Sequence, residues 1–166
     1  MKDLKQYIKT TIREFFNKNY DSEYFFNKGS YKEVFSVKNH PDKLIKKGKG
    51  VIEEAELFKK YPNVSPKIYK IDYENNLVVV EKLDNISAQK DFDELINKDR
   101  GYIHNWGYII FKDEKEYNSL RNKLTSIKGK VLLDRVREIV LTLNMKDIHS
   151  RNFGYDNNDL LKAIDI

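Results

Sequence analysis

The sequence predicts an α+β protein in which five short strands and one helix precede a mainly helical part that ends in a β-hairpin. Short apolar runs separated by turn residues fill the first half of the chain. Residues 131–143 then repeat apolar residues at helical spacing, and residues 147–165 combine a polar loop with two short apolar runs. We expect three parts: a helix at residues 1–20, a β-rich lobe at residues 21–83 and a helical lobe at residues 84–166.

The first half begins with an amphipathic helix. Residues 3–17 place apolar groups at helical spacing with charged groups between them. Residues 51–61 repeat this pattern, and Pro62 ends it because proline cannot continue a helix. Turn residues separate five extended runs, so we expect strands at residues 23–26, 33–38, 43–47, 66–73 and 76–83. The last two of these strands form a hairpin.

The second half contains three segments with helical spacing, at residues 91–96, 114–124 and 131–143. The last of them carries a wide apolar stripe and is the expected core helix. Trp106 belongs to an aromatic stretch, residues 102–111, which we interpret as core and not as a ligand platform. Two short strands close the chain, at residues 153–155 and 160–164. Residues 84–130 contain no functional motif.

The composition excludes several classes of protein. There is no cysteine, so disulfides and zinc–thiolate sites are excluded and a cytoplasmic protein is expected. No run approaches the roughly 18 apolar residues of a membrane-spanning helix, so we expect no membrane partner. The net charge of +5 arises from 31 Lys and Arg interleaved with 26 Asp and Glu. We therefore expect no nucleic-acid partner, because such partners select basic patches.

Polar motifs occur in a fixed order along the chain. Residues 29–34 read GSYKEV after the first strand, and residues 43–46 read KLIK on the third strand. The following helix carries Glu54. Residues 145–152 read MKDIHSRN directly after the core helix, and residues 163–165 read AID at the end of the last strand.

The order of these elements and motifs resembles that of protein kinases and aminoglycoside-type kinases, from residue 23 to the C terminus. The resemblance implies a minimal kinase-like fold: a five-stranded antiparallel N-lobe sheet with one helix, then a reduced helical C-lobe ending at a metal-binding hairpin. It also implies that the turn at Gly29 and Ser30 binds nucleotide phosphates and that Val34 covers the adenine ring. Lys32 stands where the family's third glycine would be. Backbone groups of the expected hinge would bind adenine, at Glu81 and Leu83.

A lysine and a glutamate of the N-lobe have linked roles in the kinases. The lysine, on the third strand, binds the α- and β-phosphates, and the glutamate orients it from the next helix. The resemblance assigns these roles to Lys46 and Glu54. Leu44 replaces the usual small residue two positions before the lysine. The spacing leaves other candidates for the two roles: Lys47, Lys49, Glu53 and Glu56.

The strongest match is to the kinase catalytic loop, H-R-D-x-x-x-x-N. Asp147 and Asn152 have the required interval, and Met145 takes the place of the histidine. The resemblance implies that Asp147 orients the acceptor hydroxyl and takes its proton, while Asn152 and Asp165 hold Mg²⁺ through oxygen atoms. His149 follows Asp147 by two residues and could contact phosphate, act as a base or form a structural hydrogen bond.

The expected function is that of an ATP- and Mg²⁺-dependent phosphotransferase of reduced size, whose acceptor the sequence does not identify. We expect a shortened form without an activation segment or substrate-docking helices after Asp165, which resembles small phage-encoded and bacterial kinase-like proteins. We therefore expect it in the cytoplasm of a bacterium or a phage-infected cell. The alternative is a pseudokinase-like binding or inhibitor protein that engages a partner protein without catalysis. Turnover of ATP distinguishes the two.

Overall fold

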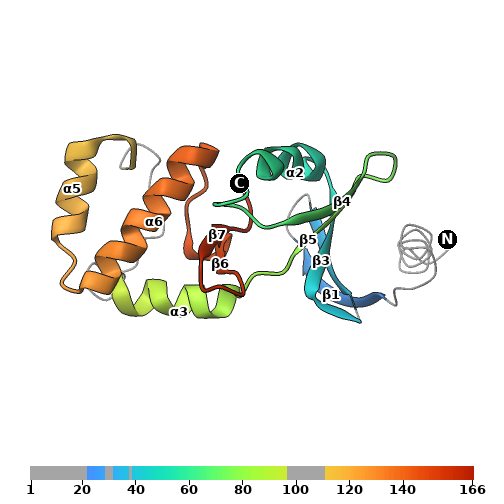
Figure 1. The fold of residues 1–166 in the computed structure, drawn as a ribbon, viewed down its shortest axis with the longest axis horizontal. Coiled ribbons are helices and arrows are strands. Elements are labelled where there is room, and N and C mark those ends of the chain that lie inside the picture. The colour runs from blue at the N-terminus through green and yellow to red at the C-terminus, as the bar shows by residue number, and fades with distance from the viewer. Residues whose placement is uncertain (1–21, 29–31, 38, 97–110) are drawn as a thin grey trace. The chain divides into compact units, whose positions relative to one another are not determined.

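The computed structural model describes most of the chain, as four stretches at residues 22–28, 32–37, 39–96 and 111–166, with the backbone alone for the first (Figure 1). The expected opening helix, the turn at Gly29 and Ser30 and the aromatic stretch around Trp106 lie outside the described residues. Helices and antiparallel sheets are both present, so the predicted α+β class is confirmed.

The chain divides into two compact units. The first comprises the residues up to Lys59 together with Lys67–Lys82, and the second comprises Lys60–Pro66 together with Leu83–Ile166. The first unit contains the larger sheet, and the second contains most of the helices. No helix in the described parts of the two units is long and apolar enough to cross a membrane.

The first unit is built on a five-stranded sheet with the order β1-β2-β3-β5-β4, in which all neighbours are antiparallel. Its strands are β1 (Ser22–Lys28), β2 (Lys32–Val37), β3 (His40–Gly48), β4 (Ile68–Asp72) and β5 (Leu77–Glu81). Strand β3 begins before the expected residue 43, because His40 already pairs with Val37 of β2.

Helix α2 (Val51–Lys60) packs on this sheet (Figure 1). Its residues Val51 and Ala55 form a buried cluster with Val78 and Val80 of β5. Gly50 precedes the helix with φ of +81°, in the left-handed region that favours glycine. The chain can therefore turn from β3 directly into α2.

The second unit combines helices with a short hairpin. Its elements are α3 (Asn85–Leu95), α5 (Glu114–Asn122), α6 (Ile127–Leu143), the 3-10 turn η2 (Ser150–Asn152), β6 (Phe153–Tyr155) and β7 (Leu161–Ala163). The apolar stripe of α6 is buried as expected, with Leu133, Val136, Ile139 and Val140 at 0% exposure. The core of this unit therefore forms around α6.

Local capping explains where these helices begin. Helix α6 starts before the expected residue 131, because the Ser126 hydroxyl accepts a hydrogen bond from the Gly129 N–H at 2.9 Å. Asp84 caps α3 in the same way through the Ser87 N–H, at 3.0 Å. Helix α3 therefore begins well before the expected residue 91.

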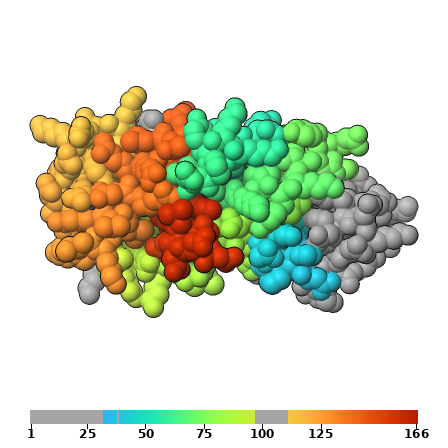
Figure 2. All heavy atoms as spheres, in the orientation of Figure 1, coloured from blue at the N-terminus to red at the C-terminus, as the bar shows by residue number. Residues whose placement is uncertain are grey.

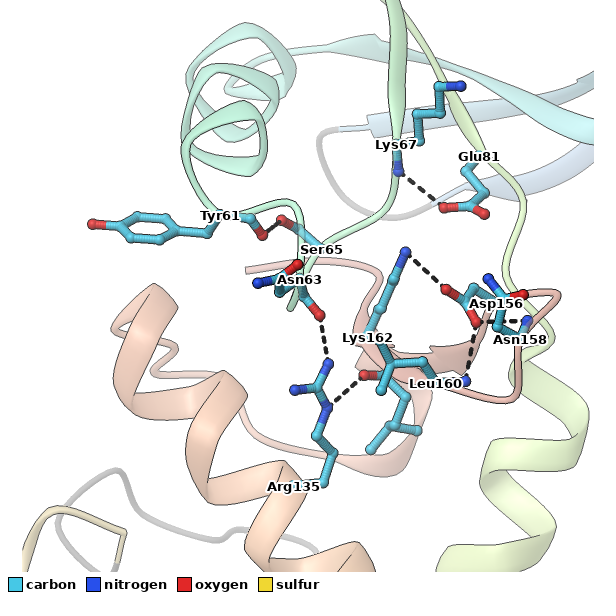
Figure 3. Close-up of polar contacts among 11 residues, drawn as sticks. Tyr61, Asn63, Ser65, Lys67, Glu81, Arg135, Asp156, Asn158, Leu160 and Lys162 are labelled. Carbon is cyan, nitrogen blue, oxygen red and sulfur yellow. Dashed lines mark hydrogen bonds and ion pairs between the residues drawn. The ribbon is translucent and has the colours of Figure 1, made fainter.

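Arg135 of α6 ties the segment Lys60–Pro66 to the second unit (Figure 3). Its Nε donates to the Leu161 carbonyl at 3.0 Å, and its other end donates to the carbonyl of Asn63. The Ala163 N–H donates to the Val64 carbonyl at 2.9 Å. The residues after α6, drawn in red, reach the surface on the face shown in Figure 2.

Candidate active site

Lys46 and Glu54 meet on one face of the first unit's sheet. Lys46 lies opposite Val78 of β5, and Leu44 lies opposite Val80. Because residues two apart share a face of a strand, Leu44 and Lys46 both point toward the side that α2 covers. The Lys46 Nζ lies 2.6 Å from the Glu54 Oε1. The expected contact between these two residues is therefore present.

The Lys46–Glu54 pair is buried, with side-chain exposures of 7% and 4%. Removing two charges from water costs several kcal/mol per ion, and their attraction seldom exceeds that cost by much. Hydrophobic residues of similar volume would often stabilise the fold as well or better. The pair is therefore better explained by a need to hold an ammonium group in place than by stability alone.

The structure distinguishes Lys46 and Glu54 from the other candidates for the same roles. Lys47 is the next residue of β3, so its side chain points to the opposite face of the sheet. Lys49 and Glu53 are exposed, and Glu56 bonds Lys59 and Tyr73 instead. The lysine and the glutamate that meet are thus the two that the resemblance assigned.

Sequence reasoning missed a third member of this cluster. The Lys32 Nζ lies 2.6 Å from the Glu54 Oε2, so the carboxylate binds two lysines. The signal was present in the spacing, because Lys32 precedes Val34 by two residues and Val34 pairs with Lys46. Lys32 therefore shares a face with Lys46, but the strand register was needed to see it.

The expected hinge lies at the end of β5. The Glu81 N–H donates to the Lys67 carbonyl at 2.9 Å, and the Glu81 carboxylate accepts from the Lys67 N–H at 3.0 Å (Figure 3). Leu83, two residues further along the chain, is buried.

Close packing and short hydrogen bonds hold Leu83 in place within the second unit. A Cβ added at Gly154 of β6 would lie 2.7 Å from the Leu83 Cβ, so only glycine allows this approach. The next residue, Asp84, exchanges two backbone hydrogen bonds with Tyr155, at 2.8 and 3.1 Å. The closing hairpin thus fixes the chain that follows β5.

The expected catalytic loop is organised by Asn152. Its side-chain Nδ2 donates to the Asp147 carbonyl at 2.9 Å, and its N–H donates to the His149 carbonyl at 2.9 Å. Asn152 is 8% exposed, whereas the Asp147 side chain is 73% exposed with Oδ2 3.4 Å from His149 Nε2. The carboxylate of Asp147 is therefore exposed to solvent, whereas Asn152 is buried.

Asn85 is a second anchor of this loop, and it too was missed from the sequence. Its Nδ2 lies 2.6 Å from the Phe153 carbonyl and 3.2 Å from the Arg151 carbonyl. Asn85 is the first residue of α3, in a region without a recognisable motif. Only the fold brings it to the loop, so no signal in the sequence could have found it.

Asp165 follows the hairpin, and the residue before it is hydrogen-bonded to the backbone of Asn152. The Ile164 N–H donates to the Asn152 carbonyl at 2.7 Å, and Asp165 is the following residue. The half-buried Asp165 accepts the Ile166 N–H at 3.1 Å through its Oδ1. The backbone bond from Ile164 joins the loop at Asn152 to the end of the hairpin, where Asp165 follows.

Asn152 and Asp165 are the two side chains expected to hold a metal ion at this loop. They are too few for a metal that is held by protein ligands alone. The described parts of the chain contain no group of three His, Cys, Asp or Glu residues that could hold a metal. Magnesium needs fewer protein ligands, because it keeps several waters and combines one or two carboxylates with substrate phosphates. Because the Nδ2 of Asn152 donates to the Asp147 carbonyl, Oδ1 is the atom of this amide that can act as an acceptor or a metal ligand.

Among solved structures, the chain is similar to a kinase. The choline kinase LicA from Streptococcus pneumoniae has 19% identity and a TM-score of 0.41, covering 98% of this chain and 68% of that one. LicA in complex with AMP has 19% identity and a TM-score of 0.40, covering 96% and 67%. No protein-family model matches the chain, and no curated protein is significantly similar to it. The expected resemblance to kinases is thus found among solved structures.

Proposed function

We propose that this protein is a kinase-like phosphotransferase that uses ATP and Mg²⁺. The observation that carries the proposal is the buried ion pair between Lys46 of β3 and Glu54 of α2. An ammonium group fixed by a buried carboxylate is a ready binding partner for nucleotide phosphates. Residues 21–83 would serve as the N-lobe and residues 84–166 as a reduced C-lobe.

In the first unit, Lys46 binds the α- and β-phosphates, and Glu54 positions Lys46. Gly29 and Ser30, where the sequence predicts a turn, would add backbone donors. Val34 lies opposite Lys46 in the β2–β3 pairing, on the face that would cover an adenine ring. The hinge supplies backbone contacts to the base, with the carbonyl of Glu81 accepting and the N–H of Leu83 donating.

In the second unit, Asn152 and Asp165 hold Mg²⁺, which neutralises charge that develops on the transferring phosphoryl group. The exposed carboxylate of Asp147 orients the acceptor hydroxyl and receives its proton. Asn85 acts as a positioning residue, because it holds the backbone of the loop that carries Asp147 and Asn152. The acceptor is a hydroxyl of a protein or a small molecule.

The alternative, a pseudokinase-like protein that engages a partner protein, is favoured by one observation. Met145, which stands in place of the kinase histidine, is 1% exposed and packs as a core residue. Its thioether has no hydrogen-bond donor, unlike the imidazole of the histidine that it replaces. In this case nucleotide binding persists and phosphoryl transfer does not occur.

A thermal-shift titration of the full chain with ATP, with and without Mg²⁺, tests the proposal. A ligand that binds only the folded protein raises its melting temperature. We expect ATP to stabilise the protein, Mg²⁺ to increase the effect, and Lys46→Met to remove most of it. Lys47→Met is the matched control, because Lys47 lies next to Lys46 on the opposite face. No stabilisation of the wild type would refute nucleotide binding.

A further inference from the structure

One carboxylate fixes two ammonium groups in the first unit. Lys46 of β3 and Lys32 of β2 each lie 2.6 Å from a different oxygen of Glu54. The side chain of Lys32 keeps 21% of its surface exposed, against 7% for that of Lys46. Lys32 is therefore the more accessible of two cations held by the same anchor.

The strand register explains how both lysines reach Glu54. Val34 pairs directly with Lys46, so their side chains share a face of the sheet. Lys32 lies two residues before Val34 and shares that face, as a diagonal neighbour of Lys46. Long side chains can bridge such diagonal positions. The proposed nucleotide side of the sheet therefore carries three neighbouring side chains, those of Lys32, Val34 and Lys46.

The chemistry of this pair suits a polyphosphate. An ammonium group carries three N–H donors, and Glu54 engages one from each lysine. Two cations held on one carboxylate can contact neighbouring phosphate groups, each through a charge-assisted hydrogen bond. Lys32 also stands at the start of β2, directly after the turn expected to contact phosphates, where the kinases have a glycine.

We propose that Lys32 is a second phosphate-binding residue, which makes the site select nucleoside di- and triphosphates over monophosphates. The proposal rests on the proposed function and deepens it. Lys46 contacts the α- and β-phosphates, and Lys32 adds a second cation at the β-phosphate. The side-chain cation of Lys32 supplies part of the phosphate binding that glycine-rich loops provide through backbone donors.

Titration calorimetry with AMP, ADP and ATP in the presence of Mg²⁺ tests this assignment on the full chain. Lys32→Met should weaken ATP and ADP binding roughly tenfold or more, as expected for a lost hydrogen bond to a charged group. AMP binding should change little, because AMP has no second phosphate. Lys47→Met, on the opposite face of β3, should leave all three affinities unchanged. Lys32→Arg should retain most of the preference for ATP over AMP.

Each outcome separates this inference from the proposed function. Equal losses of AMP and ATP affinity in Lys32→Met would mean that Lys32 only supports Glu54, and unchanged affinities would mean that it contacts no phosphate. A gain in ATP affinity would mean that Lys32 competes with the nucleotide for its place beside Lys46. Each of these three results refutes the inference and leaves nucleotide binding intact. Absence of binding by the wild type refutes both.

A measurement on the wild type covers the case in which Lys32→Met fails to fold. Lysine acetylation followed by mass spectrometry reports the reactivity of Lys32 directly. We expect ATP with Mg²⁺ to protect Lys32 and AMP to leave it reactive, with Lys47 as the internal reference. Equal reactivity of Lys32 with ATP and with AMP would overturn the assignment.

Discussion

The side-chain amide of Asn152 donates a hydrogen bond of 2.9 Å to the main-chain carbonyl of Asp147. This bond closes the loop between the two residues without using the Asp147 carboxylate, which is 73% exposed. The two proposed roles are therefore separable. The carboxylate can be altered while the bond that holds Asn152 stays in place.

Asp147→Asn should retain ATP-induced stabilisation and lose most phosphoryl transfer. The substitution keeps the shape of the side chain and removes the charge that, in the proposed mechanism, orients a hydroxyl and accepts its proton. General-base contributions of about 10²- to 10⁴-fold are typical, so transfer should fall by at least about 100-fold. Thermal shift measures binding, and radiolabelled ATP with protein and small hydroxyl acceptors measures transfer.

Asp159→Asn serves as the control for Asp147→Asn, because Asp159 has φ of +57° in an exposed turn where asparagine fits well. It should leave both readouts unchanged. A wild type that binds ATP but transfers phosphate to no acceptor, and whose partner binding ignores Asp147→Asn, would favour the pseudokinase-like alternative.

Asp165→Ala should abolish the part of ATP stabilisation that depends on Mg²⁺. In the proposed site Asp165 supplies a charged oxygen to Mg²⁺, and water cannot replace it at equal strength. ATP alone should still stabilise the variant through Lys46. Lys112→Ala, at an exposed position before α5, should keep the full magnesium effect. An unchanged magnesium dependence in Asp165→Ala would remove Asp165 from the metal site.

Local patterns in the sequence were sufficient for much of this fold. The helical spacing of residues 51–61 and 131–143 predicted α2 and α6, and turn residues separated the strands. The start of α3 was missed because it depends on one capping contact, from Asp84 to the Ser87 N–H. Capping signals are short and common, so a single Asp before a weak pattern predicts little.

The candidate site was predictable only where a motif has fixed spacing. Asp147 and Asn152 stand at a set interval in one loop, so the pattern could be recognised. Lys32 and Asn85 depend on strand register and on tertiary contacts, which no local pattern encodes. Residues that only strand register or tertiary contacts bring to the site are for this reason the ones that sequence reasoning missed.

The stability of the second unit should decrease in acid through Asp134. Hydrogen bonds from Arg121 lower the pKa of the Asp134 carboxyl below its usual 3.8, more than burial raises it. The folded protein therefore binds this proton less readily than the unfolded chain. The stabilisation is present above about pH 4 and is lost as pH falls through the lowered pKa.

The contribution of the Asp134 charge to stability is tested by measuring the melting temperatures of the wild type and of Asp134→Asn from neutral pH to below about pH 4. The difference between them should be constant near neutral pH and should shrink below about pH 4. Both side chains of the pair are more than a third exposed, so we expect a small difference that salt reduces further. A difference that persists unchanged in acid would show that the Asp134 charge is not responsible.

Glu54→Gln should destabilise the first unit more than Lys46→Met does. The glutamine leaves both Lys46 and Lys32 without the carboxylate that each bonds at 2.6 Å, whereas Lys46→Met leaves Glu54 paired with Lys32. Breaking a buried pair costs roughly 3–5 kcal/mol. Because the two lysines share one carboxylate, we expect the loss of stability in Glu54→Gln to reach or exceed that range and the loss in Lys46→Met to fall below it. Urea unfolding measures both, with Glu53→Gln at an exposed position of α2 expected to change stability by less than about 0.5 kcal/mol. A larger loss in Lys46→Met than in Glu54→Gln would mean that Lys32 does not compensate for Lys46, and that the two lysines do not share Glu54 in solution.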